Sequence, residues 1–254
     1  MSTQPLKFPG THGQFLAARL EMPRDAEPKG FALFAHCFTC TKNLRAIVRV
    51  SRALADEGFA VLRFDFTGLG ESEGDFADTN FSSNVSDLVA AGEYMERKLE
   101  SPRLLVGHSL GGAAVLHAAH SLPSVNAVAT IGAPSEPSHV LKHLRGHEDE
   151  MQEAGAATVS LGGRPFTIKR QFLEDLEATR MESAVAGLER ALLILHSPAD
   201  AVVGIENAAR LYKMAKHPKS FVSLDDADHL LSRGRDSVYT GRLLAAWVSR
   251  YLED

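Results

Sequence analysis

The stretch that most constrains how this chain folds spans residues 103–121, where a serine-centred turn lies between a short apolar segment and a run of small residues. Residues 104–106 have the composition of a buried strand, and residues 112–114 that of a closely packed helix. Ser109 stands between them in a Gly-x-Ser-x-Gly pattern. Glycines two positions before and after a strained residue remove Cβ atoms that would collide with the turn. The pattern predicts a sharp strand-to-helix turn that exposes the Ser109 hydroxyl.

The same residues also fit an ordinary helix N-cap, so the role of Ser109 depends on its partners. A serine hydroxyl is a poor nucleophile at neutral pH, and it needs a base nearby and a third group that orients the base. Asp200 and His229 each follow a predicted strand, in the chain order that such a constellation requires. We therefore predict Ser109 as nucleophile, His229 as base and Asp200 as orienting acid.

A nucleophilic serine also needs two backbone N–H groups to bind the developing oxyanion. One is expected from Leu110, directly after the serine, and the other from Phe38, in the loop after an early strand. Substitution of the Phe38 side chain should therefore alter mainly substrate fit. Cys37, Phe38 and His108 are predicted to border the substrate pocket, although sheet packing is a second position for the His108 side chain.

Other polar residues near these positions have simpler interpretations. His36 and His196 end apolar strands and are expected to be hydrogen-bonded histidines in the core. Asp225, Asp226 and Asp228 are too close to His229 in sequence to bond its ring edge-on, so we expect a solvated acidic turn.

Apolar strands alternate with helical periodicities along most of the chain, which predicts an α/β fold with a mostly parallel central sheet and helices on both faces. The expected strands are residues 15–22, 31–36, 59–65, 104–106, 125–131, 191–196 and 220–224. The expected helices, besides the one after Ser109, are residues 43–57, 84–99, 205–216 and 238–252. Residues 134–189 interrupt the alternation and predict a small cap, with a hairpin at 157–168 that turns at Gly162-Gly163.

Composition excludes several classes of partner. The 254 residues are 44% hydrophobic and 23% charged, which suits one soluble globular domain. The net charge is −5 and the basic residues are scattered, so neither nucleic acid nor an anionic membrane is expected as partner. The N-terminal residues lack a basic segment followed by an apolar run, and no apolar stretch approaches eighteen residues, so we expect a cytoplasmic protein.

The chain has two cysteines, Cys37 and Cys40, in a Cys-x-x-Cys pattern. A thioredoxin-like redox pair would begin a helix, and a zinc site would need further ligands, whereas only His36 lies nearby. We expect both cysteines to be small residues that fill a loop next to the site, with redox chemistry as the alternative.

The motifs GHSLGG, HSPAD and DADHLL resemble the nucleophile, acid and histidine segments of the α/β-hydrolase superfamily, and FDFTGLGESEG resembles a loop of that superfamily. LFAHCFTCTKN and LGGRPFTIKRQFLEDL are similar to the hydrolase half of bifunctional proteins that also carry an OsmC-like domain, which this chain lacks. The resemblance implies one α/β-hydrolase domain over residues 1–254. It also implies a serine carboxylesterase that acts on small acyl or aryl esters without metal or cofactor, with an OsmC-like protein as a candidate partner.

Cys37 stands where many members of the superfamily have glycine, so the pocket beside Phe38 is expected to be narrower. The same catalytic groups also serve thioesterases, peptidases and acyltransferases. A hypothesis of another class is a non-catalytic partner of a redox protein that uses its Cys-x-x-Cys pair.

Overall fold

The computed structural model describes residues 2–24, 26–161 and 163–252. Its main sheet has eight strands, which lie side by side in the order β1 (Ser2–Pro9), β2 (Phe15–Met22), β4 (Ala60–Phe64), β3 (Phe31–Ala35), β5 (Pro102–His108), β6 (Ala127–Ile131), β9 (Ala191–His196) and β10 (Lys219–Ser223). The pairs β1–β2 and β2–β4 are antiparallel and the others are parallel. The predicted fold class is confirmed.

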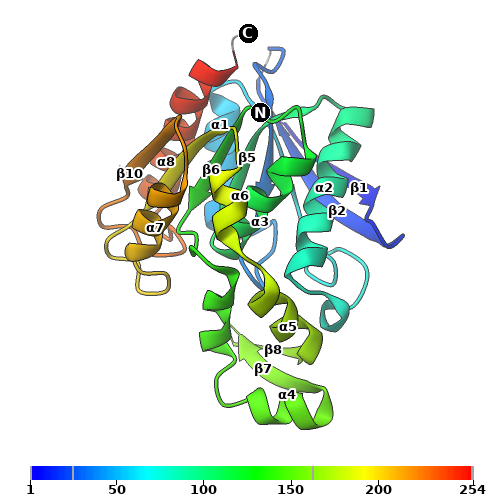
Figure 1. Ribbon diagram of the computed structural model, residues 1–254. Coiled ribbons are helices and arrows are strands. Elements are labelled where there is room, and N and C mark those ends of the chain that lie inside the picture. Colours follow the sequence, from blue (N-terminus) through cyan, green and yellow to red (C-terminus); the bar gives the residue numbers. More distant parts are fainter. Residues whose placement is uncertain (1, 25, 162, 253–254) are drawn as a thin grey trace.

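Helices cover both faces of the sheet (Figure 1). Helices α1 (Arg45–Asp56) and α8 (Gly234–Val248) pack against each other on one face. Helices α2 (Phe81–Lys98), α3 (Leu110–Ala118) and α7 (Glu206–Met214) pack on the other. Strands β3, β4, β5, β6 and β9 are almost entirely buried because both faces are covered, which explains their continuous apolar runs.

The parallel strands bring four chain segments to one edge of the sheet. Ala35 of β3 pairs with Gly107 of β5, and Ile131 of β6 pairs with Leu195 of β9. Beyond β9, the last strand of the sheet is β10, which pairs with β9 in parallel. Loops that follow these strands therefore start side by side at their carboxyl ends, where ligands of open α/β sheets bind.

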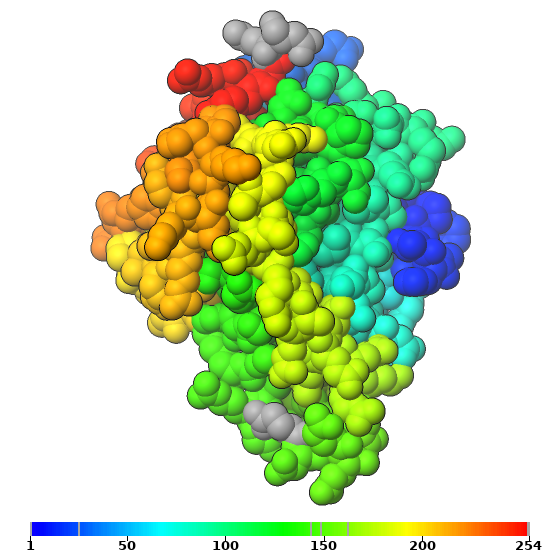
Figure 2. Space-filling view, viewed as in Figure 1, coloured from blue at the N-terminus to red at the C-terminus, as the bar shows by residue number. Residues whose placement is uncertain are grey.

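Residues 134–189, between β6 and β9, form a segment that we call the cap segment. It contains η3 (Pro137–His143), α4 (Glu148–Ala154), β7 (Ala156–Leu161), β8 (Arg164–Lys169), α5 (Arg170–Ala178) and α6 (Met181–Ala186). Its outer part projects from the body in Figures 1 and 2. The predicted hairpin is confirmed by the antiparallel pairing of β7 with β8, whereas Gly162 of its predicted turn lies outside the described residues.

Aromatic rings join the cap segment to the body. The ring of Phe172, on α5, has its centroid 5.3 Å from that of Phe38, and Phe166, on β8, lies 5.1 Å from Phe76. Phe38 and Phe76 are themselves 5.8 Å apart. These four residues, which we call the phenylalanine cluster, contain both cap residues and a predicted site residue.

Strand β1, which forms an edge of the sheet beside β2, was not predicted from the sequence. Most of its side chains are exposed, so its sequence lacks a clear apolar alternation. Among the described residues, no helix combines the length and the apolar character needed to cross a membrane.

Candidate active site

Ser109 occupies the sharp turn between β5 and α3 that its sequence predicts. Its φ is 56° and its ψ −125°, an unfavourable combination for a residue with a side chain. A Cβ at Gly107 would lie 2.2 Å from the Gly111 carbonyl oxygen, and one at Gly111 would lie 2.4 Å from that of His36. The two glycines therefore permit the turn and let the start of α3 touch the end of β3.

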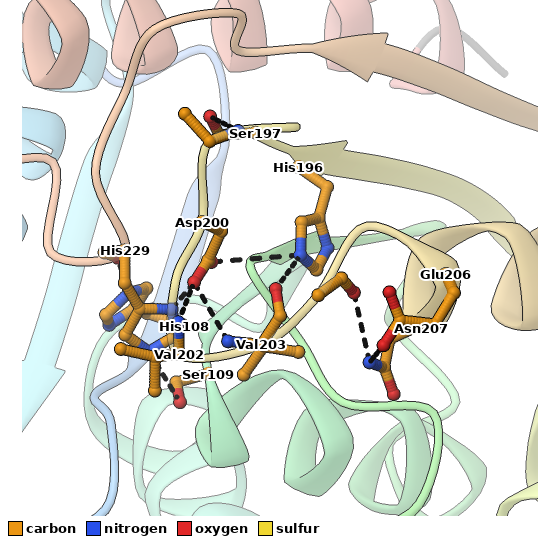
Figure 3. A network of polar contacts seen from close by, with 12 residues as sticks. His108, Ser109, His196, Ser197, Asp200, Val202, Val203, Glu206, Asn207 and His229 are labelled. Atoms are coloured by element: carbon orange, nitrogen blue, oxygen red, sulfur yellow. Dashed lines mark hydrogen bonds and ion pairs between the residues drawn. The ribbon is translucent and has the colours of Figure 1, made fainter.

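The structure brings Ser109, His229 and Asp200 together, as Figure 3 shows. The Ser109 hydroxyl donates to His229 Nε2 over 3.1 Å. The opposite nitrogen of the ring, Nδ1, donates to Asp200 Oδ2 over 2.7 Å. Both distances suit the serine, base and acid geometry expected from the sequence.

Asp200 is buried and held by several donors. Its Oδ1 accepts the backbone N–H groups of Val202 and Val203 over 2.8 and 2.9 Å. Burial raises the pKa of Asp200, but the hydrogen bonds from His229, Val203 and Val202 outweigh burial and hold that pKa below its usual value. The carboxylate therefore stays ionised beside the imidazole.

Gly132, directly after β6, is a further residue of the site. Its φ is +55°, and a Cβ there would lie 3.1 Å from Asp200 Oδ2 and 3.3 Å from His229 Nδ1. The missing side chain thus leaves room for the side chains of Asp200 and His229 to meet.

His36 organises the loop that carries Phe38. Its Nδ1–H donates to the Cys37 carbonyl oxygen over 2.8 Å, and burial lowers the pKa of His36 to about 4, which keeps the ring neutral. The Cys37–Phe38 peptide is trans, so its N–H points away from the carbonyl that His36 holds. The prediction of a hydrogen-bonded core histidine is confirmed, as it is for His196, whose Nε2–H donates to the Val203 carbonyl.

Cys37 and Cys40 lie in the expected loop but form a disulfide, with their Cα atoms 5.3 Å apart. The sequence predicts two small residues that merely fill this loop, whereas the structure joins them covalently. Thr39, inside the loop, has a φ of +59°, which is rare for a β-branched residue. The Arg164 guanidinium, from β8 of the cap segment, donates to the Thr39 carbonyl.

A cavity of about 310 Å³ opens in front of Ser109. Predominantly apolar groups line it, and they come from the Phe38 loop, the cap segment and the loops after β9 and β10: Cys37, Phe38, Thr39, Cys40, Leu110, Pro134, Val140, Leu161, Val202, Val203 and Leu230, together with Ser109, His139 and His229. The predicted pocket residues Cys37 and Phe38 are among them. Val202 and Leu230 remain 36% and 42% exposed, which gives the cavity apolar walls that reach solvent.

His108 takes the second of its two predicted positions. It does not border this cavity but lies buried beside His229, because its Nε2–H donates to the His229 carbonyl over 2.7 Å. Burial, followed by the nearby His229, lowers the pKa of His108 to about 3. The prediction that His108 lines the substrate pocket is therefore replaced by a role in fixing the His229 loop.

The acidic residues around His229 are exposed, as expected. Asp228 accepts the backbone N–H of Ser232 over 2.7 Å, and Asp225 and Asp226 face solvent. Within the described part of the chain, no group of three or more His, Cys, Asp or Glu side chains could hold a metal ion.

Residues 26–157 match the family described as serine aminopeptidase, S33. The chain is 52% identical to the esterase domain of a Rhodothermus marinus protein, with 100% of both chains covered and a TM-score of 0.83. A stretch of 121 residues is 30% identical to the mitochondrial palmitoyl-protein thioesterase ABHD10 of Rattus norvegicus. This stretch covers 48% of the chain but 39% of that relative, so the match spans well under two thirds of its length.

The fold itself is shared more widely. The mouse α/β hydrolase domain-containing protein 10 superposes with a TM-score of 0.78 at 20% identity, covering 97% of this chain and 99% of that one. The chain has the α/β-hydrolase fold, and because the family match covers over half of the 254 residues, it belongs to the family described as serine aminopeptidase, S33.

Proposed function

We propose that this hydrolase is a serine carboxylesterase that cleaves esters of small acyl or aryl groups, and that residues 1–254 act as one catalytic unit under the cap segment. The observation that carries the proposal is the continuous chain of hydrogen bonds from Ser109 through His229 to Asp200, which opens into an apolar cavity. The 52% sequence identity to an esterase domain, over the whole length of both chains, supports it.

In the proposed reaction, His229 Nε2 accepts the Ser109 proton while Oγ attacks the ester carbonyl. Asp200 stabilises the imidazolium that forms, and the N–H groups of Phe38 and Leu110 bind the oxyanion. His229 then gives its proton to the departing alcohol. Water, activated by the same imidazole, hydrolyses the acyl-enzyme and restores Ser109.

The size of the cavity supports the choice of substrate. Its volume of about 310 Å³ lies at the lower end of the roughly 300–1,000 Å³ typical of ligand pockets. Its apolar lining suits a short acyl chain or an aromatic ring better than a charged peptide. We therefore expect turnover to fall as the acyl chain lengthens from butyrate to palmitate.

A thioesterase is the second candidate, because part of the chain is 30% identical to a palmitoyl-protein thioesterase. The same nucleophile, base and oxyanion donors would cleave a thioester. Two further parts of the proposal are a cytoplasmic location, which is expected from the N-terminal residues and the lack of long apolar stretches, and an OsmC-like partner, which the sequence resemblance implies. Cell fractionation would test the first and co-purification the second.

The test compares wild type with Ser109→Ala on p-nitrophenyl acetate, butyrate and palmitate and on the matched acyl-CoA thioesters. We expect the variant, folded by circular dichroism, to lose about 10⁴-fold or more in kcat on the preferred ester. Faster turnover of thioesters would favour the second candidate. Equal kcat values for wild type and Ser109→Ala would contradict the serine mechanism.

A further inference from the structure

The loop that carries the proposed oxyanion donor Phe38 is closed by a disulfide and contains a strained residue. Thr39 has a φ of +59°, although its two substituents on Cβ make the left-handed region unfavourable. Conformations of this kind persist only where the surroundings force them. The loop therefore needs restraints on either side of Thr39.

Among the described contacts, three restraints span Thr39 or act on it directly. The disulfide joins Cys37 to Cys40, the Cys40 N–H donates to the Cys37 carbonyl over 3.1 Å, and Arg164 donates to the Thr39 carbonyl. The two hydrogen bonds can be exchanged for bonds to water at little net cost. The disulfide cannot be exchanged in this way, so it is the restraint that keeps Thr39 in its unfavourable conformation.

The Phe38 N–H belongs to the Cys37–Phe38 peptide, which lies inside the ring that the disulfide closes over residues 37–40. Inside a closed ring the backbone torsions of Phe38 and Thr39 are coupled, so relaxation of Thr39 after the ring opens lets the Cys37–Phe38 peptide reorient as well. From this geometry we propose that the Cys37–Cys40 disulfide is a positioning element for the Phe38 N–H, so that turnover depends on its oxidation state. The inference rests on the proposed function, because it assigns Phe38 to the oxyanion. It goes beyond that function by making the disulfide part of the working site.

The disulfide can be reached through the cavity. Cys40 is partly exposed and borders the same cavity as Ser109, whereas Cys37 is buried. A thiolate of an external dithiol would attack Cys40 Sγ and release Cys37 as a thiolate, which takes up a proton. The second thiol of the reagent then attacks the mixed disulfide and frees Cys40. Two electrons pass to the protein, and the reagent leaves as a cyclic disulfide.

A merely structural disulfide predicts a different result. Closing so short a loop restrains the unfolded chain only weakly, and its loss would lower thermal stability without changing kcat of the folded enzyme. A positioning role predicts a fall in kcat with little change in KM, because the oxyanion forms only in the transition state.

The experiment measures p-nitrophenyl butyrate turnover before and after dithiothreitol, with two thiols per chain titrated in the reduced sample. Two variants separate strain from simple cross-linking. Thr39→Val keeps the β-branch, whereas asparagine in Thr39→Asn tolerates the left-handed region. A Cys37→Ser, Cys40→Ser double variant controls for effects of the reagent elsewhere.

We expect reduction to lower kcat of wild type and Thr39→Val by about tenfold or more, up to the 10²–10³ of losing one oxyanion donor. Thr39→Asn should respond by less than about threefold, because its loop stays in place without the disulfide. The kcat of the Cys37→Ser, Cys40→Ser double variant should equal that of reduced wild type and should not change with dithiothreitol. Unchanged kcat in fully reduced wild type, or equal responses of the two Thr39 variants, would overturn the proposal.

Amide hydrogen exchange of residues 36–42 provides a readout that needs no turnover. Reduction should speed exchange there in wild type and Thr39→Val but not in Thr39→Asn. If the oxidised wild type hydrolyses no ester, the proposed function fails, and this exchange pattern still decides whether the disulfide holds the loop.

Discussion

Ser109 and Gly132 have nearly the same φ, 56° and 55°, but for different physical reasons. Ser109 keeps its side chain in a strained turn because that turn aims the hydroxyl at His229. Gly132 has no side chain because Asp200 and His229 occupy the space where a Cβ would stand. The turn at Ser109 therefore presents the hydroxyl that we propose as nucleophile, and Gly132 leaves room for the side chains of Asp200 and His229.

We predict that Gly132→Ala lowers kcat by about tenfold or more and destabilises the fold by about 1–2 kcal/mol, the cost of a left-handed alanine. The new methyl would stand 3.1 Å from Asp200 Oδ2 and press the acid away from His229. Ester kinetics and urea denaturation measure the two effects.

Gly13→Ala is the matched control. Gly13 has a φ of +86°, and a Cβ at this position would meet nothing within 4 Å, so it shares the backbone cost without the contact. We expect similar destabilisation with unchanged kcat. An active Gly132→Ala enzyme would show that the acid and the base tolerate displacement.

The meeting of Ser109, Asp200 and His229 was predictable because each follows a strand in a recognisable local pattern, and their strands meet at one edge of a parallel sheet. The importance of Gly132 was not, because its neighbours Asp200 and His229 are remote in sequence. The disulfide was equally hidden, because whether two cysteines bond depends on the distance and orientation between Cys37 and Cys40, which their spacing in sequence does not give.

At the scale of elements, the cap segment is attached where α5 meets the body. Asp175 of α5 accepts two hydrogen bonds from Ser82 at the start of α2, from N–H over 2.8 Å and from Oγ over 2.5 Å. Phe172, one turn earlier, packs on Phe38 in the phenylalanine cluster. The position of the cap segment and that of the Phe38 loop are therefore linked through one helix.

We predict that Phe172→Ala lowers the free energy of unfolding by about 3–5 kcal/mol, as expected for removing a buried ring. We also expect KM to rise, because the Phe38 side chain, which lines the cavity, loses a packing partner. The Phe172 ring is 1% exposed. Phe221→Ala on β10, where the ring is 42% exposed, is the control and should change stability by less than about 0.5 kcal/mol. Equal effects of the two substitutions in urea denaturation would refute the role of the cluster.

Elements with strong apolar patterns were predictable, including the hairpin of the cap segment, whose buried and exposed residues alternate along β7. Strand β1 was not, because it contains two prolines and buries little. Its conformation is set by pairing with β2 along eight residues, a tertiary interaction that leaves little trace in its own sequence.

At the scale of the whole molecule, buried imidazoles couple stability to pH. Burial lowers the pKa of His36 to about 4 and that of His108 to about 3, from 6.5. Between these values and 6.5 the unfolded chain binds more protons than the folded one, so acid favours unfolding. The stabilisation is fully present above pH 6.5 and is lost as the pH falls toward 4.

We predict that the free energy of unfolding decreases from pH 7 to pH 4.5, and that His108→Gln makes the decrease shallower by up to about 1.4 kcal/mol per pH unit. Glutamine can still donate to the His229 carbonyl but carries no titratable ring. Urea denaturation across this range measures both slopes. Parallel curves for the two proteins would mean that His108 does not titrate on unfolding.

The proposed oxyanion donors belong to the main chain, in the loop after β3 and at the start of α3, and Gly111 lets the start of this loop touch α3. Side chains around the cavity can therefore vary in evolution without loss of the groups that stabilise the transition state. New substrate preferences are accessible through changes in the cap segment and at exposed positions such as Val202 and Leu230. Enzymes that descend from this fold can therefore change their substrate preference while they keep the proposed reaction mechanism.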